Sequence, residues 1–227
     1  MDVNLYLEKI EGQYAGKFEE FKNLLLEYNN KFNLTAITDE KEIKIKHFLD
    51  SAAGEAFFKE NADVVEIGSG GGFPSIPLKI LREDLNFTLI ESTGKKCGYL
   101  QAVVDKLNLH CVKVLNARAE DAARDKIYRE KFDVAVARAV ARLNTLCEYC
   151  LPFVKVGGKF IAYKGGCGEE IKEALNAIKV LGGEIETKEE YELPDGDNRT
   201  LIVIKKVAPT PLKYPRGQGK ERKCPIV

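Results

Sequence analysis

Two acidic side chains, each close to the end of a short hydrophobic run, have the type and spacing needed to hold a nucleotide-like ligand. Glu66 is followed by glycines at positions 68, 70, 71 and 72, and Glu91 ends the next hydrophobic run, 86–91. A strand, a glycine turn and a helix N-terminus together leave backbone N–H groups free to meet a ligand. An acid at the end of the following strand can accept hydrogen bonds from ribose hydroxyls. We therefore expect a ribose-containing ligand here.

The glycine pattern does not match two common nucleotide motifs. The dinucleotide fingerprint G-x-G-x-x-G would need a glycine at position 73, which is a phenylalanine. A P-loop would need Gly-Lys-Ser/Thr at the end of the loop, and this sequence is missing. The spacing Glu66-x-Gly68-x-Gly70-x-Gly72 instead resembles motif I of the S-adenosylmethionine-dependent methyltransferases. The resemblance implies that these four residues bind this cofactor and that Glu91 binds its ribose.

Further candidate contacts follow the next expected strands. Ala119 and Glu120 come just after the third strand, where methyltransferases of this architecture bind the adenine amino group. Glu120 could alternatively be an acidic side chain that stabilises a helix N-terminus. Phe73 could shield the methionine portion of the cofactor or simply pack beneath the loop. Arg138 ends the fourth strand and should face the transferred methyl group, unless it pairs with a carboxylate such as Glu120.

The residues around Arg138 indicate which atom is methylated. DNA amino-group methyltransferases usually carry Asn/Asp-Pro-Pro-aromatic here, whereas residues 137–140 are Ala-Arg-Ala-Val. Cytosine-C5 enzymes need a thiolate nucleophile, and Cys147 and Cys150 lie well into the following helix. The N7 atom of guanine already carries a lone pair, so it needs alignment with the methyl group and no general base. Arg138 could hydrogen-bond guanine O6 or a phosphate with its planar fork, which makes it the candidate catalytic residue.

Composition limits the class of protein. A chain of 227 residues suits one domain with an appendage. The six cysteines have no repeating spacing, and the pair Cys147–Cys150 lacks the further ligands of a zinc site, so we expect buried thiols and no metal. The N-terminus lacks the apolar core of a signal peptide, and no apolar run approaches membrane-spanning length. We expect a reduced, cytoplasmic, monomeric protein that does not bind membranes.

Hydrophobic periodicity predicts an α/β fold with a doubly wound, seven-stranded, mostly parallel sheet. The expected strands lie near 63–67, 86–91, 110–115, 132–137, 157–163, 184–192 and 199–206. The turn at 194–198 is too short for a helical crossover, so the last two strands should be antiparallel. Before the sheet, helical stripes are interrupted near Gly12 and Gly16, and Asp39 should cap a helix that runs to about Lys59.

The end of the chain differs in composition from the rest. Between Lys205 and Lys223 there are seven basic residues and one acidic residue, and prolines and glycines are frequent after Val207. Such a segment should be irregular and could bind a polyanion, although a solvated tail without a partner is the alternative. We therefore expect three regions, which are an N-terminal helical extension (1–60), a methyltransferase domain (61–207) and a basic Pro/Gly-rich tail (208–227).

Several sequence blocks identify a family. They lie at 33–37 (NLTAI), 47–51 (HFLDS), 66–74 (EIGSGGGFP), 137–141 (ARAVA) and 214–219 (YPR followed by GQG). In this order they resemble the RsmG (GidB) family of bacterial 16S rRNA guanine-N7 methyltransferases over nearly the whole chain. Ser75, where the family usually has glycine, and Lys223-Cys-Pro225 are small departures.

The resemblance implies a Rossmann-like class I fold with an N-terminal helical extension. It implies that S-adenosylmethionine is the cofactor and S-adenosylhomocysteine the product. The implied cofactor contacts are Gly68, Phe73, Ala119, Glu120 and Arg138. The implied substrate is a guanine in the decoding region of 16S rRNA, within the 30S subunit or an assembly intermediate.

Basic and aromatic side chains outside the cofactor motifs are candidates for RNA binding. They are His47, Lys164, Arg199, Tyr214, Arg216 and Lys220. Cationic contacts to phosphates would make binding weaken steeply with added salt, and Tyr214 could stack on an unpaired base. The alternatives are a hydrogen-bonded packing role for His47 and an ordinary loop position for Lys164.

Two other functions are compatible with parts of the pattern. A small-molecule methyltransferase would have no use for the basic tail, so deletion of residues 208–227 should leave its activity intact. A non-catalytic RNA-binding or assembly protein on the same fold would not need Glu66, Glu91 and the glycine loop, and it should fail to bind the cofactor in a calorimetric titration.

Overall fold

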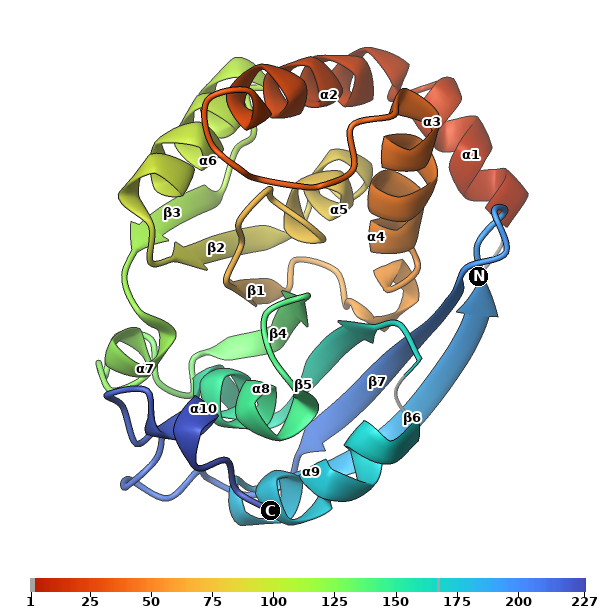
Figure 1. Ribbon diagram of the computed structural model, residues 1–227. Coiled ribbons are helices and arrows are strands. Elements are labelled where there is room, and N and C mark those ends of the chain that lie inside the picture. The colour runs from red at the N-terminus through yellow and green to blue at the C-terminus, as the bar shows by residue number, and fades with distance from the viewer. Residues whose placement is uncertain (1–2, 167) are drawn as a thin grey trace.

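The computed structural model describes residues 3–166 and 168–227, and its centre is a seven-stranded sheet (Figure 1). The strands are β1 (Asp63–Ile67), β2 (Asn86–Glu91), β3 (Val112–Asn116), β4 (Phe132–Arg138), β5 (Val154–Lys164), β6 (Gly183–Glu192) and β7 (Asn198–Lys206). Their order is β3-β2-β1-β4-β5-β7-β6, with β1 to β5 parallel and β7 antiparallel to both β5 and β6. The expected fold class and the antiparallel final pair are confirmed.

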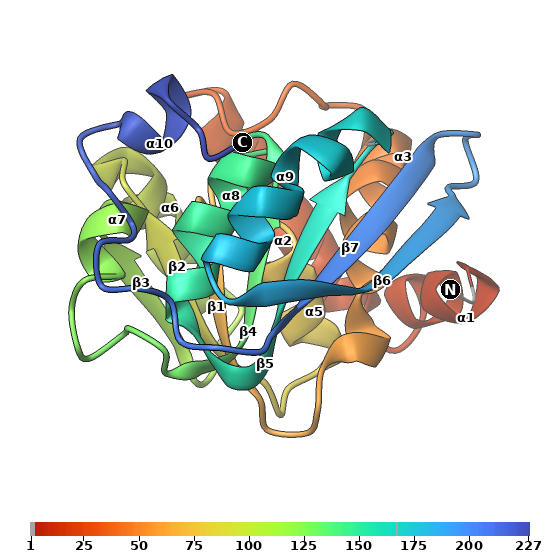
Figure 2. The same ribbon diagram turned by 90° about the horizontal axis from the view of Figure 1, so that it is seen from below.

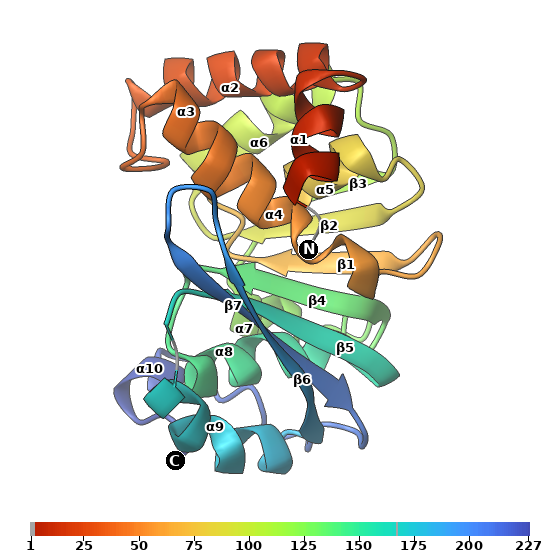
Figure 3. The ribbon, with the colours of Figure 1, turned by 90° about the vertical axis from the view of Figure 1, so that its right-hand side faces the viewer.

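Helices cover both faces of the sheet, as Figure 3 shows in side view. One face is packed by α2 (Ala15–Asn29), α5 (Ser75–Leu81) and α6 (Gly94–Lys106), which share a core with Val64 and Val136. The other face is packed by α7 (Ala119–Ala122), α8 (Leu143–Cys150) and α9 (Gly168–Val180), which share a core with Val65 and Ala135. Successive residues of a strand point to opposite faces, so buried β-branched residues in β1 supply both cores.

The N-terminal region adds a second group of helices to the first core. It contains α1 (Val3–Glu11) and α2, then α3 (Glu40–Glu42), the π-helix η1 (Ile43–Leu49), α4 (Asp50–Ala52) and the short 3₁₀ helix η2 (Glu55–Phe57). The side chain of Asp39 accepts hydrogen bonds from the N–H groups of Lys41 and Glu42, both at 3.0 Å, which confirms the expected cap.

The expectation of one regular helix from Asp39 to about Lys59 is wrong. The helix contains a π-helical segment and ends at Ala52. The hydroxyl of Tyr163 on β5 donates a hydrogen bond to the carbonyl of Ser51 at 3.0 Å, and a Cβ added to Gly54 would collide with the same hydroxyl. The sheet therefore occupies the place where the helix would have continued.

The prediction that the C-terminal tail is irregular is only partly correct. After the sheet it passes α7 and forms a short helix, α10 (Lys220–Lys223), which lies against α8 (Figure 2). Elsewhere in the fold, a 3₁₀ turn, η3 (Leu151–Phe153), links α8 to β5.

The C-terminal tail is ordered because side chains of the body bind its backbone. For example, Arg129 donates hydrogen bonds to the carbonyls of Thr210 at 2.8 Å and Tyr214 at 2.9 Å.

Three general expectations can be compared with the described residues. Cys147 and Cys150 are fully buried in the second core, which confirms them as small apolar residues, while Cys167 lies outside the described residues. In residues 3–166 and 168–227, no three His, Cys, Asp or Glu side chains are grouped so that they could hold a metal ion. No helix in the same part of the chain is long and apolar enough to cross a membrane.

Candidate functional site

The glycine loop after β1 has a backbone that ordinary side chains rarely adopt. Gly68, Gly70 and Gly72 have φ values of +71°, +49° and +87°. The N–H groups of Gly68 and Ser69 donate to the carbonyl of Ile90 at 2.8 Å and 3.2 Å, which ties the loop to β2. A Cβ on Gly68 would lie 2.8 Å from a methyl carbon of Val140. The glycines are therefore required by the turn and by close packing with the segment that follows β4.

Glu91, at the end of β2, holds the loop in place. Its carboxylate accepts hydrogen bonds from the N–H of Gly70 at 3.1 Å and from the N–H of Thr93 at 2.8 Å. The first bond fixes the glycine loop and the second fixes the start of α6. An ionised carboxylate can accept about four hydrogen bonds, so Glu91 keeps acceptor capacity for a ligand hydroxyl.

A cavity of about 310 Å³ opens at the carboxyl ends of β1, β2 and β3. It brings together three of the predicted cofactor residues, which are Gly68, Ala119 and Glu120. Its volume is at the lower end of the range of small-molecule sites, and such sites in doubly wound sheets lie at this edge. Sequence reasoning missed other residues of its wall, and they are Ile67, Ile90, Ser92, Ala117, Arg118, Val140, Tyr149, Gly219 and Arg222.

Glu66 does not line this cavity, although the motif had suggested a direct contact. Its side chain is 0% exposed, and in the part of the chain that the structure describes neither carboxylate oxygen has a hydrogen-bond partner. Burial is the largest influence and raises the pKa of this carboxyl to about 8. The nearby hydroxyls of Ser75 and Ser69 and the positive charge of Arg138 act in the opposite direction, because they favour the ionised form. Gly70 likewise contributes to the loop backbone rather than to the cavity wall.

Phe73 packs beneath the loop, which was the second of its two expected roles. Its ring stacks on His47 at a centroid distance of 4.3 Å and contacts the ring of Phe21 at 5.3 Å. The guanidinium carbon of Arg138 lies 4.8 Å from the centroid of the same ring. This cation–π contact, together with the hydrophobic support, helps to fix the plane of the arginine.

Arg138 is held by the N-terminal helices. Its Nη1 donates to the carbonyl of Lys46 at 3.0 Å and to Oδ2 of Asp50 at 2.8 Å, and its Nη2 is 2.9 Å from Nδ1 of His47. The alternative expectation, that Arg138 pairs with a carboxylate, is confirmed, but the partner is Asp50 and not Glu120. The cation near Glu120 is Arg118, at 3.9 Å.

His47 is a neutral packing residue. Nδ1 of His47 is 2.9 Å from Arg138 and 3.2 Å from the carbonyl of Lys46. A guanidinium can only donate, so we assign the shorter contact as a hydrogen bond that Nδ1 accepts, which places the ring proton on Nε2, 2.8 Å from the hydroxyl of Thr35. Burial and the charge of Arg138 lower the pKa of His47 to about 3. The residue is 8% exposed. These contacts favour the packing role over the RNA contact.

Asp50 is the centre of the network around Arg138. Besides the arginine, it accepts a hydrogen bond from the hydroxyl of Tyr191 at 2.8 Å, and Nε of Arg199 lies 3.6 Å from the same oxygen, Oδ1. Tyr191 and Arg199 are paired neighbours on β6 and β7. Sequence reasoning missed Tyr191, because only the hairpin register brings it to a helix 141 residues away in the chain.

A second cavity, of about 290 Å³, opens at the ends of β4, β5 and β7. Its walls include Arg138, Ala139, Lys164 and Arg199. Ala139 has a left-handed backbone with φ of 57°, and the next residue, Val140, faces the first cavity instead. The segment after β4 therefore lies between the two cavities.

The six candidate RNA residues have different environments. Lys164 donates to the carbonyl of Ala141 and to Glu170, both at 2.7 Å, and Arg199 pairs with Asp197 at 3.0 Å. Tyr214 is half-buried against the second core, and Lys220 is exposed on α10. Arg216 grips the fully buried Glu148 with two nitrogens, so its fork is already occupied.

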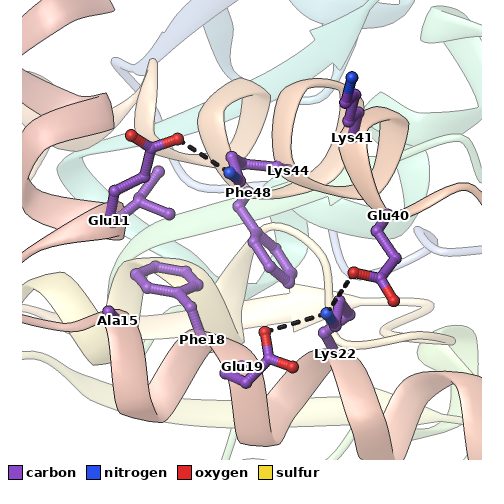
Figure 4. Close-up of a pocket in the computed structure, with 10 residues that line it drawn as sticks. Glu11, Ala15, Phe18, Glu19, Lys22, Glu40, Lys41, Lys44 and Phe48 are labelled. Carbon is purple, nitrogen blue, oxygen red and sulfur yellow. Dashed lines mark hydrogen bonds and ion pairs between the residues drawn. The ribbon is translucent and has the colours of Figure 1, made fainter.

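A hollow of about 420 Å³ lies apart from these residues, between α1, α2 and the helix that begins at α3 (Figure 4). Its apolar side is formed by Phe18 and Phe48. Lys22 pairs with Glu19 at 2.9 Å and with Glu40 at 2.7 Å. The hollow contains none of the candidate residues, and Lys22, its buried lysine, is already paired with two carboxylates.

Comparisons with known proteins show the family and the fold. The family model described as GidB, rRNA small subunit methyltransferase G, matches residues 15–195. The chain is 47% identical over 226 residues to ribosomal RNA small subunit methyltransferase G of Acetivibrio thermocellus, covering 99% of this chain and 91% of that protein. A solved SAM-dependent methyltransferase from Aquifex aeolicus has a TM-score of 0.53 at 18% identity, covering 73% of this chain and 93% of that chain. The structure of M. jannaschii TYW2 in complex with AdoMet has a TM-score of 0.52 at 19% identity, and the match covers 67% of this chain and 73% of that chain. Both structural matches concern the fold alone.

Proposed function

Since the chain belongs to the family of rRNA small subunit methyltransferase G (GidB), we propose that it methylates N7 of a guanine in 16S rRNA with S-adenosylmethionine. The substrate we propose is the 30S subunit or an assembly intermediate, and the enzyme we propose is a cytoplasmic monomer. In this proposal residues 61–207 form the methyltransferase domain, with a helical extension in 1–60 and a tail in 208–227.

The first cavity suits an adenosyl group. Its walls combine apolar side chains such as Ile90 with the carboxylate of Glu120, which can accept a hydrogen bond from an adenine amino group. In this proposal the ribose hydroxyls donate to the remaining acceptor positions of Glu91, which already binds the N–H of Gly70, and Gly68 presents loop backbone at the cavity wall. When bound, S-adenosylmethionine supplies an electrophilic methyl group on its sulfonium sulfur.

The observation that carries the proposal is the position of residues 138–140 between the two cavities. Val140 faces the cofactor cavity, whereas Arg138 and Ala139 face the second one. In this proposal a base turned out of its RNA stack enters through the second cavity, and its N7 meets the sulfonium methyl directly beside residues 138–140, which border both cavities. Enzymes that act on bases commonly extrude the target base into such a pocket.

The residues near the second cavity fit a reaction without a general base. The pKa of His47 is lowered to about 3, and its Nδ1 is already bound to Arg138, so it has no role in proton removal at neutral pH. Guanine N7 uses its own lone pair to take the methyl group and has no proton to lose. Three of the five N–H donors of Arg138 are bound to Lys46, Asp50 and His47. The other two are available to guanine O6 or a phosphate.

Cationic side chains around the second cavity supply the contacts to the RNA backbone in this proposal. Lys164 and Arg199 are at its wall, and Lys220 is exposed on α10. Both wall residues already have carboxylate partners, so an RNA phosphate would have to share or replace Glu170 and Asp197. We expect methylation to decrease with added salt, because each neutralised phosphate releases counterions.

A methyl-transfer assay tests the proposal. Small subunits that lack the modification are incubated with labelled S-adenosylmethionine and wild-type protein, Arg138→Ala or Arg142→Ala. Arg142 is a matched control, because it is exposed and follows the same strand. We expect label on one guanine N7, lost in Arg138→Ala and kept in Arg142→Ala. Label on another base or atom would contradict the proposed target. Urea denaturation of Arg138→Ala separates loss of transfer from loss of folding, because Arg138 is itself an implied cofactor contact and cofactor affinity could fall for either reason.

A further inference from the structure

We propose that the C-terminal tail, residues 208–227, is part of the cofactor site and that Arg222 is a binding residue for the adenosyl group. This inference rests on the proposed use of S-adenosylmethionine. It changes the interpretation of the tail, whose basic composition had suggested an arm for RNA. Three features support this role, and they are the docking of the tail, the turn that precedes Arg222, and the wall that Arg222 shares with the glycine loop.

The tail contributes directly to the first cavity. Gly219 and Arg222 line it together with Gly68, Glu120 and Tyr149. Gly68 follows β1, Glu120 and Tyr149 lie on α7 and α8, and the two tail residues lie at the start of α10 and within it. A ligand that fills the cavity therefore contacts the tail as well as the glycine loop.

The body of the protein binds the tail mainly through the tail's backbone. Arg124 donates hydrogen bonds to the carbonyl of Pro215 at 2.9 Å and to that of Arg216 at 2.6 Å. The side chain of Arg216 in turn grips Glu148, at 3.0 Å from Nε and 2.7 Å from Nη2. Glu148 is fully buried, so this paired charge is strongly favoured over an unpaired one. The tail is thus docked by contacts within the chain and needs no RNA to order it.

The turn before Arg222 has a defined geometry. Gly217 has φ of 77°, and a Cβ there would lie 3.1 Å from the guanidinium of Arg124. Glu221 is fully buried, and its side chain accepts a hydrogen bond from the N–H of Gly217. The hydroxyl of Thr145 on α8 donates to the carbonyl of Glu221 at 3.0 Å. With Glu221 directed inward, the next residue, Arg222, is directed to the cavity mouth.

Arg222 belongs to the same wall as the glycine loop. Its Nη2 donates to the carbonyl of Val140 at 3.3 Å, and the side chain of Val140 packs against Gly68. Arg222 is exposed at the rim, while Glu120 is buried inside the cavity. A guanidinium is planar and stacks on flat aromatic rings, and a purine is such a ring. Arg222 therefore covers the adenine ring, and the amino group of that ring donates a hydrogen bond to Glu120.

Calorimetric titration with S-adenosylhomocysteine, without RNA, tests this role. The variants are Arg222→Ala and the control Lys223→Ala, which removes an exposed cation from the next position of α10. A stacked guanidinium lost from the cavity mouth should weaken binding roughly 5- to 30-fold. Lys223→Ala should stay within about twofold of the wild type. Equal affinity of wild type and Arg222→Ala would overturn the inference.

Hydrogen exchange provides a second readout. If the tail stabilises the bound ligand, the ligand must stabilise the tail by the same amount. S-adenosylhomocysteine should therefore slow amide exchange in residues 217–223 of the wild type, and the slowing should be smaller in Arg222→Ala. An Arg222→Ala protein that binds the ligand normally but loses rRNA methylation would show that this side chain contacts RNA instead. Failure of the wild type to bind the ligand at all would contradict the proposed function itself, a separate outcome.

Discussion

Replacement of Glu66 by glutamine should change the pH dependence of stability in a defined direction. Glu66 is fully buried at the end of β1, and within the described residues both of its carboxylate oxygens lack a hydrogen-bond partner. Desolvation raises its pKa from 4.5 to about 8, although Ser75, Ser69 and Arg138 oppose the shift. Glutamine has nearly the same shape and mimics the protonated, neutral form without titrating.

The size of the effect follows from the two pKa values. Between pH 4.5 and about 8 the folded state binds the proton and the unfolded state has lost it, so the free energy of unfolding falls as pH rises. The stabilisation is complete below 4.5 and lost above about 8. Each pH unit in this window changes the free energy by about 1.4 kcal/mol, so the whole window is worth at most about 5 kcal/mol. At pH 7 the variant should be more stable than the wild type by about 3 kcal/mol.

Urea denaturation at pH 5, 7 and 8.5 measures this difference. The control is Glu60→Gln, an exposed carboxylate close to the start of the same strand. We expect the gap between Glu66→Gln and wild type to widen steadily with pH and the Glu60→Gln curve to follow the wild type. A gap that stays constant between pH 5 and 8.5 would refute the reasoning, because it would mean that Glu66 does not titrate in this range.

Three other changes have expected outcomes. Gly68→Ala should weaken cofactor binding about tenfold in a calorimetric titration, because its φ of +71° is unfavourable for alanine and the new methyl group would press on Val140 at 2.8 Å; an unchanged affinity would contradict this. Tyr191→Phe removes the hydroxyl bound to Asp50 and should lower the free energy of unfolding by about 1–2 kcal/mol in urea, together with methylation activity. Burial lowers the pKa of Lys206 from 10.5 to about 8, so between these values the unfolded state binds the extra proton and stability rises with pH. Wild type should therefore gain up to about 3 kcal/mol over Lys206→Met from pH 8 to 10.5, and parallel pH profiles would count against it.

The elements of the fold were largely predictable from local patterns. The β-branched run at 64–67, the glycines after it and the alternation of strands and helices gave the sheet and the position of its ligand edge. The helix start at Asp39 was predictable, because a cap binds N–H groups only two and three residues further along the chain. Glu91 was correctly placed at the end of β2, although its bond to Gly70 was not foreseen.

The partners of charged side chains were not predictable in the same way. Arg138 was expected to face the transferred methyl group, with an ion pair to a carboxylate such as Glu120 as the alternative. The carboxylate that it contacts is Asp50, which comes from the N-terminal helices. Arg216 was a candidate phosphate contact, and the sequence did not indicate that its side chain pairs with Glu148 on α8. A local sequence pattern shows that a charged side chain is present, but it does not predict which distant carboxylate the fold brings beside it.

The sequence by itself determined the class of fold, the glycine loop and the family, because periodicity, turn residues and motif spacing involve neighbours along the chain. The tertiary structure alone decided that Asp50 joins Arg138 to Tyr191 and that the tail reaches the first cavity. The first arrangement depends on strand order and hairpin register, and the second on the docking of the tail against α8. Together they bring residues about 70 to 140 positions apart into contact. Burial then fixes these partners, since a charge removed from water must find its counterpart wherever the fold has placed one.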